Sequence, residues 1–302
     1  MTDTPSPARS LVGISLGMLA VVGWGIYNVG TEIGQAQGFR APDLTLLRYA
    51  VGAVVLLPWF VWRGRSLDQR RLVVLALVGG PVFALILNQG YQLAPLAHAV
   101  VIGPAMSIIT ALSLVRLVDG QKISARRILG LCILLGGLAV IGLDRGSGTQ
   151  LTASVLKGDL CFVCSGGLWG LYSWLLGHWR MPPVETTAGV AIYASAVYVP
   201  VYLTLWGLPD LPVSVWAQQV LFQGLIGGSG ALVAFAIAVG ILGTARASVF
   251  NALVPPSTVL MAIPMAAMFP SPLQWLGVGL ATVGLMLALA FTGPKPATPA
   301  QG

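Results

Sequence analysis

The sequence is dominated by apolar runs, each about as long as a lipid bilayer is thick. Ten of them follow one another, at 10–32, 43–62, 71–92, 98–117, 126–143, 157–177, 186–206, 214–239, 246–269 and 272–291. A helix rises about 1.5 Å per residue, so about twenty residues cross the ~30 Å hydrocarbon core. The runs therefore predict an all-α polytopic membrane protein with ten transmembrane helices. Runs of this length do not fit the short alternating strands of a transmembrane barrel.

The composition supports a membrane protein. Only 8% of the residues are charged, whereas soluble domains have about 25%. The net charge of +7 comes from residues in short loops, so it does not indicate nucleic-acid binding. Cys132, Cys161 and Cys164 all lie within apolar runs. The Cys161-x-x-Cys164 spacing occurs in metal and redox sites, but further ligands are missing nearby, and we interpret the pair as packing residues. We expect neither a metal nor a cofactor.

The basic residues predict the orientation of the chain in the membrane. With the N-terminus in the cytoplasm, twelve of the sixteen Lys and Arg residues fall on the inner face and three on the outer face. Arg48 falls within the second apolar run. Because basic residues favour cytoplasmic loops, we expect both termini in the cytoplasm, as tails at 1–9 and 293–302.

Two stretches of the chain repeat each other. GISLGMLAVVGWGIYN (13–28) and GDLCFVCSGGLWGLYSW (158–174) align at an offset of 145 and share the pattern W-G-x-Y. Nearly the same offset recurs for Gly79-Gly80 with Gly227-Gly228, at 148, and for Gly130 and Gly137 with Gly277 and Gly284, at 147. Matches in the same order predict an internal duplication, with repeats at 10–150 and 151–292.

Five helices per repeat is an odd number, so the second repeat is expected to be inverted in the membrane. The loop charges agree with this. The loop after the second run has three arginines and a fourth, Arg71, begins the third run, whereas the corresponding loop after the seventh run has none. An inverted five-plus-five repeat around a central cavity is an architecture of alternating-access transporters.

Several stretches resemble a known family. These are the W-G-x-Y of the first helix, LLRYAVGA around Arg48, NQGYQLAPLAHAVVIGPAMSIITALSLVRLVDGQKIS, and GILGTARASVFNALVPPSTVLMA. They resemble the drug/metabolite transporter superfamily, EamA type, and are most similar to its YddG-like amino-acid exporters. The resemblance implies an inverted ten-helix fold in a bacterial inner membrane and export of amino acids. The family's Gly-Glu pair after helices 4 and 9 is replaced by Asp119-Gly120 in the first copy and by MFPSPLQ, which has no acid, in the second.

Polar and aromatic side chains at membrane depth need a partner or a water-filled cavity. Those in the first and sixth helices fall on one face of each helix, and repeat symmetry would turn both faces towards one cavity. The alternatives are packing, interfacial belts and hydrogen bonds between helices. The predicted substrate-binding residues are Trp24, Tyr27, Asn28, Asn88, Tyr91, Trp169, Tyr172, Ser173, Gln223 and Asn251.

Two further groups are candidates for movement or gating. Glu32 and Arg48 are expected to pair near the outer face, as a structural contact or as part of a gate. His98 near the outer end of the fourth helix is either a titrating group or a hydrated interfacial residue. The predicted hinges, for which packing alone is the alternative, are Gly79, Gly80, Pro81, Gly227, Gly228, Pro255 and Pro256.

The scarcity of deep charges limits the possible cargo. No carboxylate lies in the middle of a run, which disfavours a cationic drug and favours a neutral or zwitterionic solute. We expect an alternating-access secondary transporter that exports amino acids (aromatic or other neutral) and related small metabolites. The alternatives are a transporter of nucleotide-sugars or other anionic metabolites, and a channel or scaffold. An enzyme is not expected, because paired acids and Ser-His pairs are absent at depth. The expected partners are a small-molecule substrate and the lipid bilayer but no nucleic acid, and a monomer fits the sequence.

Overall fold

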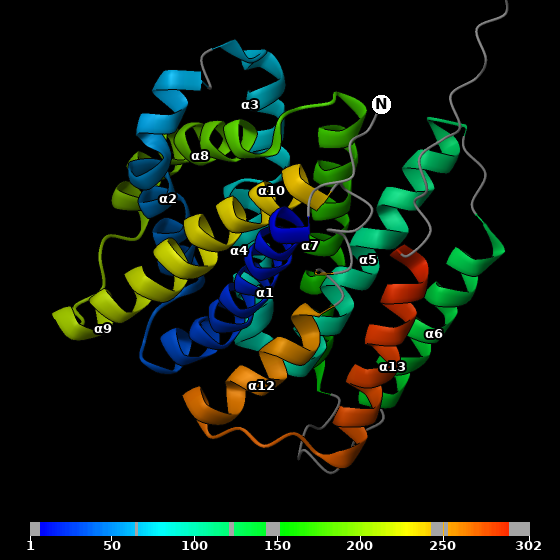
Figure 1. The fold of residues 1–302 in the computed structure, drawn as a ribbon. Coiled ribbons are helices and arrows are strands. Elements are labelled where there is room, and N and C mark those ends of the chain that lie inside the picture. The colour runs from blue at the N-terminus through cyan, green and yellow to red at the C-terminus, as the bar shows by residue number, and fades with distance from the viewer. Residues whose placement is uncertain are drawn as a thin grey trace, which may run out of the picture.

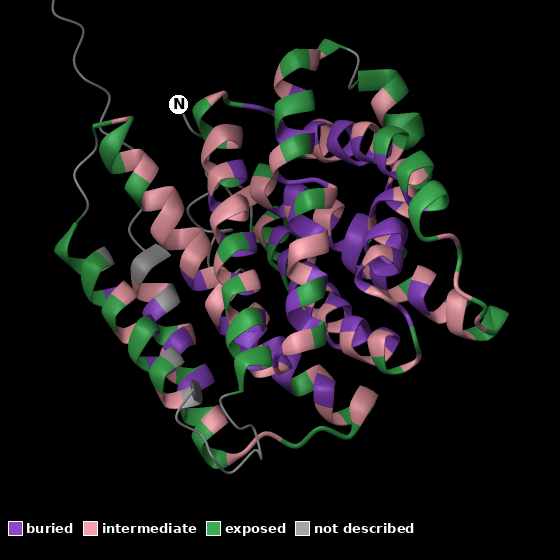
Figure 2. Cartoon of the chain, turned by 180° about the vertical axis from the view of Figure 1, so that it is seen from behind, coloured by how far each residue is buried: buried purple, intermediate pink, exposed green. Residues whose placement is uncertain are grey.

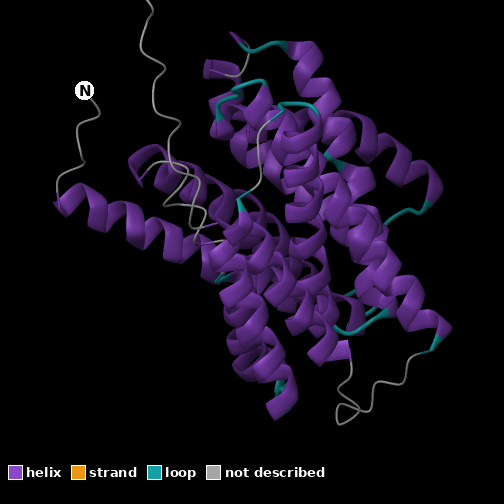
Figure 3. Ribbon diagram, turned by 90° about the vertical axis from the view of Figure 1, so that its right-hand side faces the viewer, coloured by secondary structure: helices purple, strands orange, loops and turns teal. Residues whose placement is uncertain are grey.

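The computed structural model describes residues 7–63, 66–120, 124–142, 152–242, 250 and 253–289, and the regular elements in these ranges are all helical (Figures 1 and 3). Each predicted apolar run overlaps a helix or a broken helix. The tail at 293–302 lies outside the described residues, and the first helix begins within the predicted tail 1–9. The elements are α1 (Pro7–Ala36), α2 (Ala41–Arg63), α3 (Gln69–Val78), α4 (Pro81–Leu93), α5 (Leu96–Leu117), α6 (Ala125–Gly142), α7 (Ala153–His178), α8 (Pro183–Leu205), α9 (Val213–Gln219), η2 (Val220–Gly230), α10 (Ala231–Leu242), α12 (Val254–Ala266) and α13 (Pro272–Leu289).

The all-helical membrane fold predicted from the sequence is confirmed. Within the described residues, seven helical stretches are long and apolar enough to cross a membrane, and 128–137 and 254–266 are shorter apolar helices. Buried residues gather in the middle of the bundle, and many of the outer faces are exposed (Figure 2). Large apolar side chains such as Val54, Leu77 and Val197 are exposed on these faces, as expected where a helix meets lipid. Exactly ten spans remains a prediction.

The third helix of each predicted repeat is interrupted near a glycine pair. In the first repeat, α3 ends before Gly79-Gly80 and α4 begins at Pro81. In the second, Gly227-Gly228 lies within η2, a π-helix between α9 and α10. Small-residue pairs and π-helical turns are both established sites of bends in helical segments. Whether these interruptions act as hinges stays a prediction.

Pro255 and Pro256 lie at the start of a helix, and 243–249 and 251–252 before them are outside the described residues. They follow Val254, the first residue of α12, and so lie in its first turn. A proline is tolerated there because its missing N–H has no partner within the helix at that position. Whether they interrupt a longer helix stays a prediction.

Helices α6 and α13 lie side by side at one edge of the bundle (Figure 1). A Cβ added to Gly137 would lie 2.6 Å from the backbone of both Gly277 and Ala281, so the two backbones touch. A Cβ added to Gly284 would in turn meet the backbone of Gly130 and Leu134. Each contact becomes the other when positions are shifted by 147. Residues early in α6 contact residues late in α13, and residues late in α6 contact residues early in α13, so the two helices are antiparallel.

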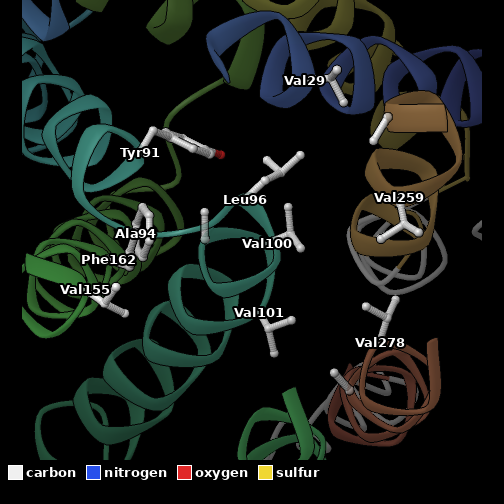
Figure 4. Close-up of a cluster of buried hydrophobic side chains, with 13 residues drawn as sticks. Val29, Tyr91, Ala94, Leu96, Val100, Val101, Val155, Phe162, Val259 and Val278 are labelled. Carbon is white, nitrogen blue, oxygen red and sulfur yellow. The ribbon is translucent and has the colours of Figure 1, made fainter. Parts of the chain in front are cut away.

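The largest buried apolar cluster joins the two halves of the chain. Its members come from α1, α4 and α5 on one side and from α7, α12 and α13 on the other (Figure 4). Tyr91 packs edge-on against Phe162, with ring centroids 5.5 Å apart. The cluster consists of Val29, Tyr91, Ala94, Leu96, Ala99, Val100, Val101, Val155, Phe162, Val259, Ala262, Val278 and Ala281.

Helices α5 and α7 run parallel and are joined near both ends by histidine–aspartate pairs. His98 Nδ1 lies 2.8 Å from Asp159 Oδ1 near their N-termini. His178 Nδ1 lies 3.0 Å from Asp119 Oδ1 at the other end, where Trp174 Nε1 also donates to Asp119. His98 is only 8% exposed, so the interpretation as a hydrated interfacial residue does not hold. Its role as a titrating group stays a prediction.

The glycine contact between α6 and α13 predicts a difference between two neighbouring glycines. Gly137→Val forces the helices apart, whereas a Cβ at position 136 meets nothing within 4 Å. Overpacking a tight contact costs about 1–3 kcal/mol, so we expect Gly137→Val to lower the melting temperature in detergent. Gly136→Val should melt close to the unmodified protein. Equal melting of the two variants would contradict the backbone contact.

Candidate functional site

A cavity opens between the two halves of the chain. It encloses about 460 Å³ of empty space, which includes space open to the surroundings. The first half contributes residues of α2 and the end of α3, and the second half contributes residues of α7, α8, η2 and α10. The lining residues are Arg48, Tyr49, Gly52, Leu56, Gly79, Trp169, Tyr172, Thr187, Val190, Ala191, Gly228, Ser229 and Leu232.

Arg48 lies two turns into α2, with its guanidinium among aromatic rings. The guanidinium carbon lies 4.9 Å from the ring centroid of Tyr27, 5.6 Å from that of Phe83 and 5.9 Å from that of Tyr49. Such contacts stabilise a cation by about 0.5–2 kcal/mol each. The predicted ion pair with Glu32 is absent, and Arg48 pairs with no other carboxylate in the described part of the chain.

Glu32 is placed differently from the sequence prediction, which put it at the end of the first helix. α1 continues to Ala36, so Glu32 lies inside the helix. Its Oε2 atom is buried and has no hydrogen-bond partner among the described residues. It does not line the cavity. Its assignment to a gate therefore stays a prediction without the ion pair that motivated it.

The tryptophans of the two W-G-x-Y motifs occupy different surroundings. Trp169 lines the cavity, stacks on Tyr172 with centroids 5.0 Å apart and lies 5.2 Å from the ring of Phe83. Trp24 instead packs against Phe235 of α10 at 5.2 Å and is not among the cavity-lining residues. Of the two, the structure brings only Trp169 to the cavity.

The tyrosines of the same motifs each pack against a glycine of the opposite repeat. A Cβ on Gly79 would lie 2.5 Å from Cδ2 of Tyr172, and a Cβ on Gly227 would meet the Tyr27 side chain. Tyr27 and Tyr172 are 145 positions apart, and the glycines are 148 apart. Both glycines are predicted hinges. In the structure, each lacks the side chain that would prevent a tyrosine ring from packing against the backbone.

The predicted polar residues mainly connect helices to one another. Tyr91 Oη donates to Asn28 Oδ1 at 3.0 Å, and Asn28 Nδ2 donates to Thr258 Oγ1 at 3.0 Å, which links α4, α1 and α12. Gln223 Nε2 donates to the carbonyl of Tyr27 and to Thr31 Oγ1, both at 3.2 Å. None of these side chains lines the cavity.

Three further predicted residues have different outcomes. Asn88 is fully buried and donates to Thr45 Oγ1 at 3.1 Å, while its Oδ1 has no partner in the described structure. Ser173 is exposed and donates to the carbonyl of Trp169 in its own helix, so its placement in the cavity is wrong. Ser173 directly follows Tyr172 in α7, and neighbouring residues of a helix point in different directions. The Tyr172 side chain is buried, and that of Ser173 is exposed. Asn251 lies outside the described residues.

Several groups near the cavity were missed from the sequence. Tyr49 Oη donates to the carbonyls of Gly79 and Gly80 at 2.8 Å, which satisfies the backbone where α3 ends. The only sequence signal for Tyr49 is its position directly after Arg48. Thr187 and Ser229 supply neutral polar groups to the lining, and single hydroxyls in apolar helices give no signal that separates them from packing residues.

A second ionic contact lies at the connection between α1 and α2. Arg40 Nη2 donates to Asp43 Oδ1 at 2.8 Å and to the carbonyl of Gly207 at 2.8 Å. Hydrogen bonding to Asp43 raises the pKa of the Arg40 guanidinium above its ordinary value. The Tyr202 hydroxyl also donates to Asp43. This cluster fastens α2 to the end of α8 and lies outside the cavity lining. Within the described residues, no group of three or more His, Cys, Asp or Glu side chains could hold a metal ion.

Comparison with known proteins identifies a family whose model matches this chain. The model of the EamA-like transporter family matches residues 11–143 and 156–290. A solved structure described only as a crystal structure of a protein is 18% identical, covers 93% of this chain and 96% of its own, and superposes with a TM-score of 0.68. At that identity the likeness shows the fold alone. No curated protein matches the chain.

The contact between Gly79 and Tyr172 predicts a local effect on the cavity. Gly79→Ala places a methyl group against the Tyr172 ring and should displace it from the cavity wall. Overpacking costs about 1–3 kcal/mol, so we expect lower thermal stability and weaker quenching of tryptophan fluorescence by bound solutes. Gly103→Ala, whose new methyl group meets nothing within 4 Å, is the control. A variant Gly79→Ala with unchanged stability and quenching would show that Tyr172 is not held by this contact.

Proposed function

The chain belongs to the EamA-like transporter family, and from this premise we propose that it is an alternating-access secondary transporter exporting amino acids, aromatic or other neutral, and related small metabolites. The observation that carries the proposal is the cavity between the halves, lined by the adjacent rings of Trp169 and Tyr172. Aromatic faces suit an apolar or aromatic side chain. Within the family we propose a YddG-like amino-acid exporter, on the resemblance of the sequence stretches described above.

The proposed architecture is an inverted repeat of five plus five transmembrane helices. The contacts between α6 and α13 support it, because a shift of 147 positions exchanges the Gly137 contact with the Gly284 contact. The antiparallel arrangement of these two helices, the last of each half, is what inversion requires. The exchanged contacts of Tyr27 and Tyr172 with Gly227 and Gly79 give further support.

The proposed cycle moves the halves around the cavity. The interruption at Gly79-Gly80 and the π-helix at Gly227-Gly228 both border the cavity. Broken helices next to a central site are common in alternating-access transporters, so we propose movement at these two points. The basic residues in the loops support a multi-pass protein with both termini in the cytoplasm. The proposal of a bacterial inner membrane rests on the family resemblance.

Transport of nucleotide-sugars or other anionic metabolites is the alternative function. It would be favoured by several cations around the cavity, because a pyrophosphate carries at least two negative charges. The lining contains one, Arg48. This single cation favours a cargo with fewer negative charges than a pyrophosphate.

The proposal predicts saturable exchange that depends on Trp169. Purified protein in liposomes should exchange labelled phenylalanine for internal phenylalanine, and Trp169→Ala should raise the half-saturation concentration about tenfold or more, as expected for loss of a central aromatic anchor. Trp62→Ala removes a tryptophan that is 70% exposed and should leave exchange unchanged. Linear, non-saturating flux would favour a channel, and absence of flux for every amino acid tested would remove the substrate class.

A further inference from the structure

Arg48 is the one charged side chain among the thirteen residues that line the cavity. A charge within a membrane helix is costly and by default marks a function. The sequence suggested that Glu32 would compensate it, and that ion pair is absent. The structure therefore leaves a positive charge in the wall of a cavity, and what balances that charge requires an explanation.

The protein itself does not supply a counter-charge from its described residues. Seven carboxylates lie in the described ranges, and none of them lines the cavity. Four have other partners: Asp43 pairs with Arg40 and Asp68 with Arg71, and Asp119 and Asp159 contact the rings of His178 and His98. The three rings around Arg48 stabilise its charge without neutralising it. An anion that enters the cavity would complete the pair.

The donors around Arg48 match a carboxylate. A guanidinium presents parallel N–H groups that bind the two oxygens of a carboxylate together. The Tyr27 ring lies 4.9 Å from the guanidinium carbon, and its hydroxyl is buried without a partner in the described structure. Tyr27 itself is only 3% exposed. Tyr27 is not among the residues that line the cavity, so the group that faces a bound carboxylate is the Arg48 guanidinium.

The rest of the cavity wall matches a flat apolar body. Trp169 stacks on Tyr172, and Leu56 and Val190 line the same space. No acidic group is present in the lining to hold an ammonium. One guanidinium balances one negative charge, so a phosphate dianion or a diphosphate would remain uncompensated.

We infer that the cavity binds a monocarboxylate with a flat apolar body, whose carboxylate pairs with Arg48 and whose body lies against Trp169 and Tyr172. This rests on the proposed transport function and names its cargo class: the carboxylate is required, and the ammonium is not. Aromatic amino acids belong to the class because of their carboxylate, and arylalkanoic acids without an amino group belong to it equally.

Three ligands that differ in one charged group test this. Liposomes containing the protein are assayed for exchange of labelled phenylalanine in the presence of phenylalanine, 3-phenylpropionate or phenethylamine. We expect 3-phenylpropionate to compete at least as strongly as phenylalanine, and phenethylamine to compete more than about tenfold less, as expected for loss of a charge-assisted pair. Equal or stronger competition by phenethylamine would overturn the inference and leave a working amino-acid carrier.

Variants of two arginines in α2 test whether Arg48 is the group that binds the carboxylate. Arg48→Gln should lose saturable exchange of both labelled phenylalanine and labelled 3-phenylpropionate, and Arg48→Lys should retain part of it, because lysine keeps the charge but not the paired donors. Arg63→Gln is the matched control, since Arg63 also lies over aromatic rings, those of Trp59 and Trp62, at the end of the same helix. Unchanged exchange of both compounds in Arg48→Gln would overturn the assignment to Arg48.

Binding without transport separates the inference from the proposed function. The melting temperature of the purified protein is measured with 3-phenylpropionate and with phenethylamine. Stabilisation by 3-phenylpropionate alone supports the inference even if no exchange occurs, in which case only the transport proposal fails. Stabilisation by phenethylamine, or by neither compound, counts against the inference. The measurement uses the unmodified protein, so it decides the question even if Arg48→Gln does not fold.

Discussion

Close approach at glycines is the constraint on which this bundle depends. In a bilayer the hydrophobic effect does not drive helices together, so close packing of small residues has to do so. Gly137 and Gly284 let α6 and α13 touch along their backbones, and Gly79 and Gly227 admit tyrosine rings from the other half. The last two contacts also shape the site, because they put Tyr172 in the cavity wall and Tyr27 against the guanidinium of Arg48.

Features that depend on local sequence were predictable. Apolar runs located the helices and glycine pairs located both interruptions, because hydropathy and glycine content affect the backbone at their own position in the chain. The end of α1 was not predictable in this way. Hydropathy placed it at 32, yet the helix continues to Ala36 because Gln35 donates to the carbonyl of Asn88 and Gly34 packs against Gln219. Polar residues that bind a neighbouring helix are hidden from a hydropathy profile.

The candidate site was only partly predictable, since repeat symmetry gives a position but not its neighbours. Trp24 and Trp169 occupy equivalent positions, yet Phe235 covers the first while the second faces the cavity. Glu32 and Arg48 were paired because they have opposite charges and lie near the same end of adjacent segments. The structure instead directs Arg48 towards aromatic rings. Which face of a helix a charge takes is set by tertiary packing.

Arg48 also makes a nearly symmetric scaffold asymmetric. At offsets of 145–148, the positions that correspond to it are 193–196, which read Tyr-Ala-Ser-Ala and contain no charge. A cation in each half would give the cavity two equivalent anion sites that alternate in accessibility, and the cargo would have to reverse its orientation to pass between them. With one cation, the charged end of the cargo stays with α2 throughout the proposed cycle.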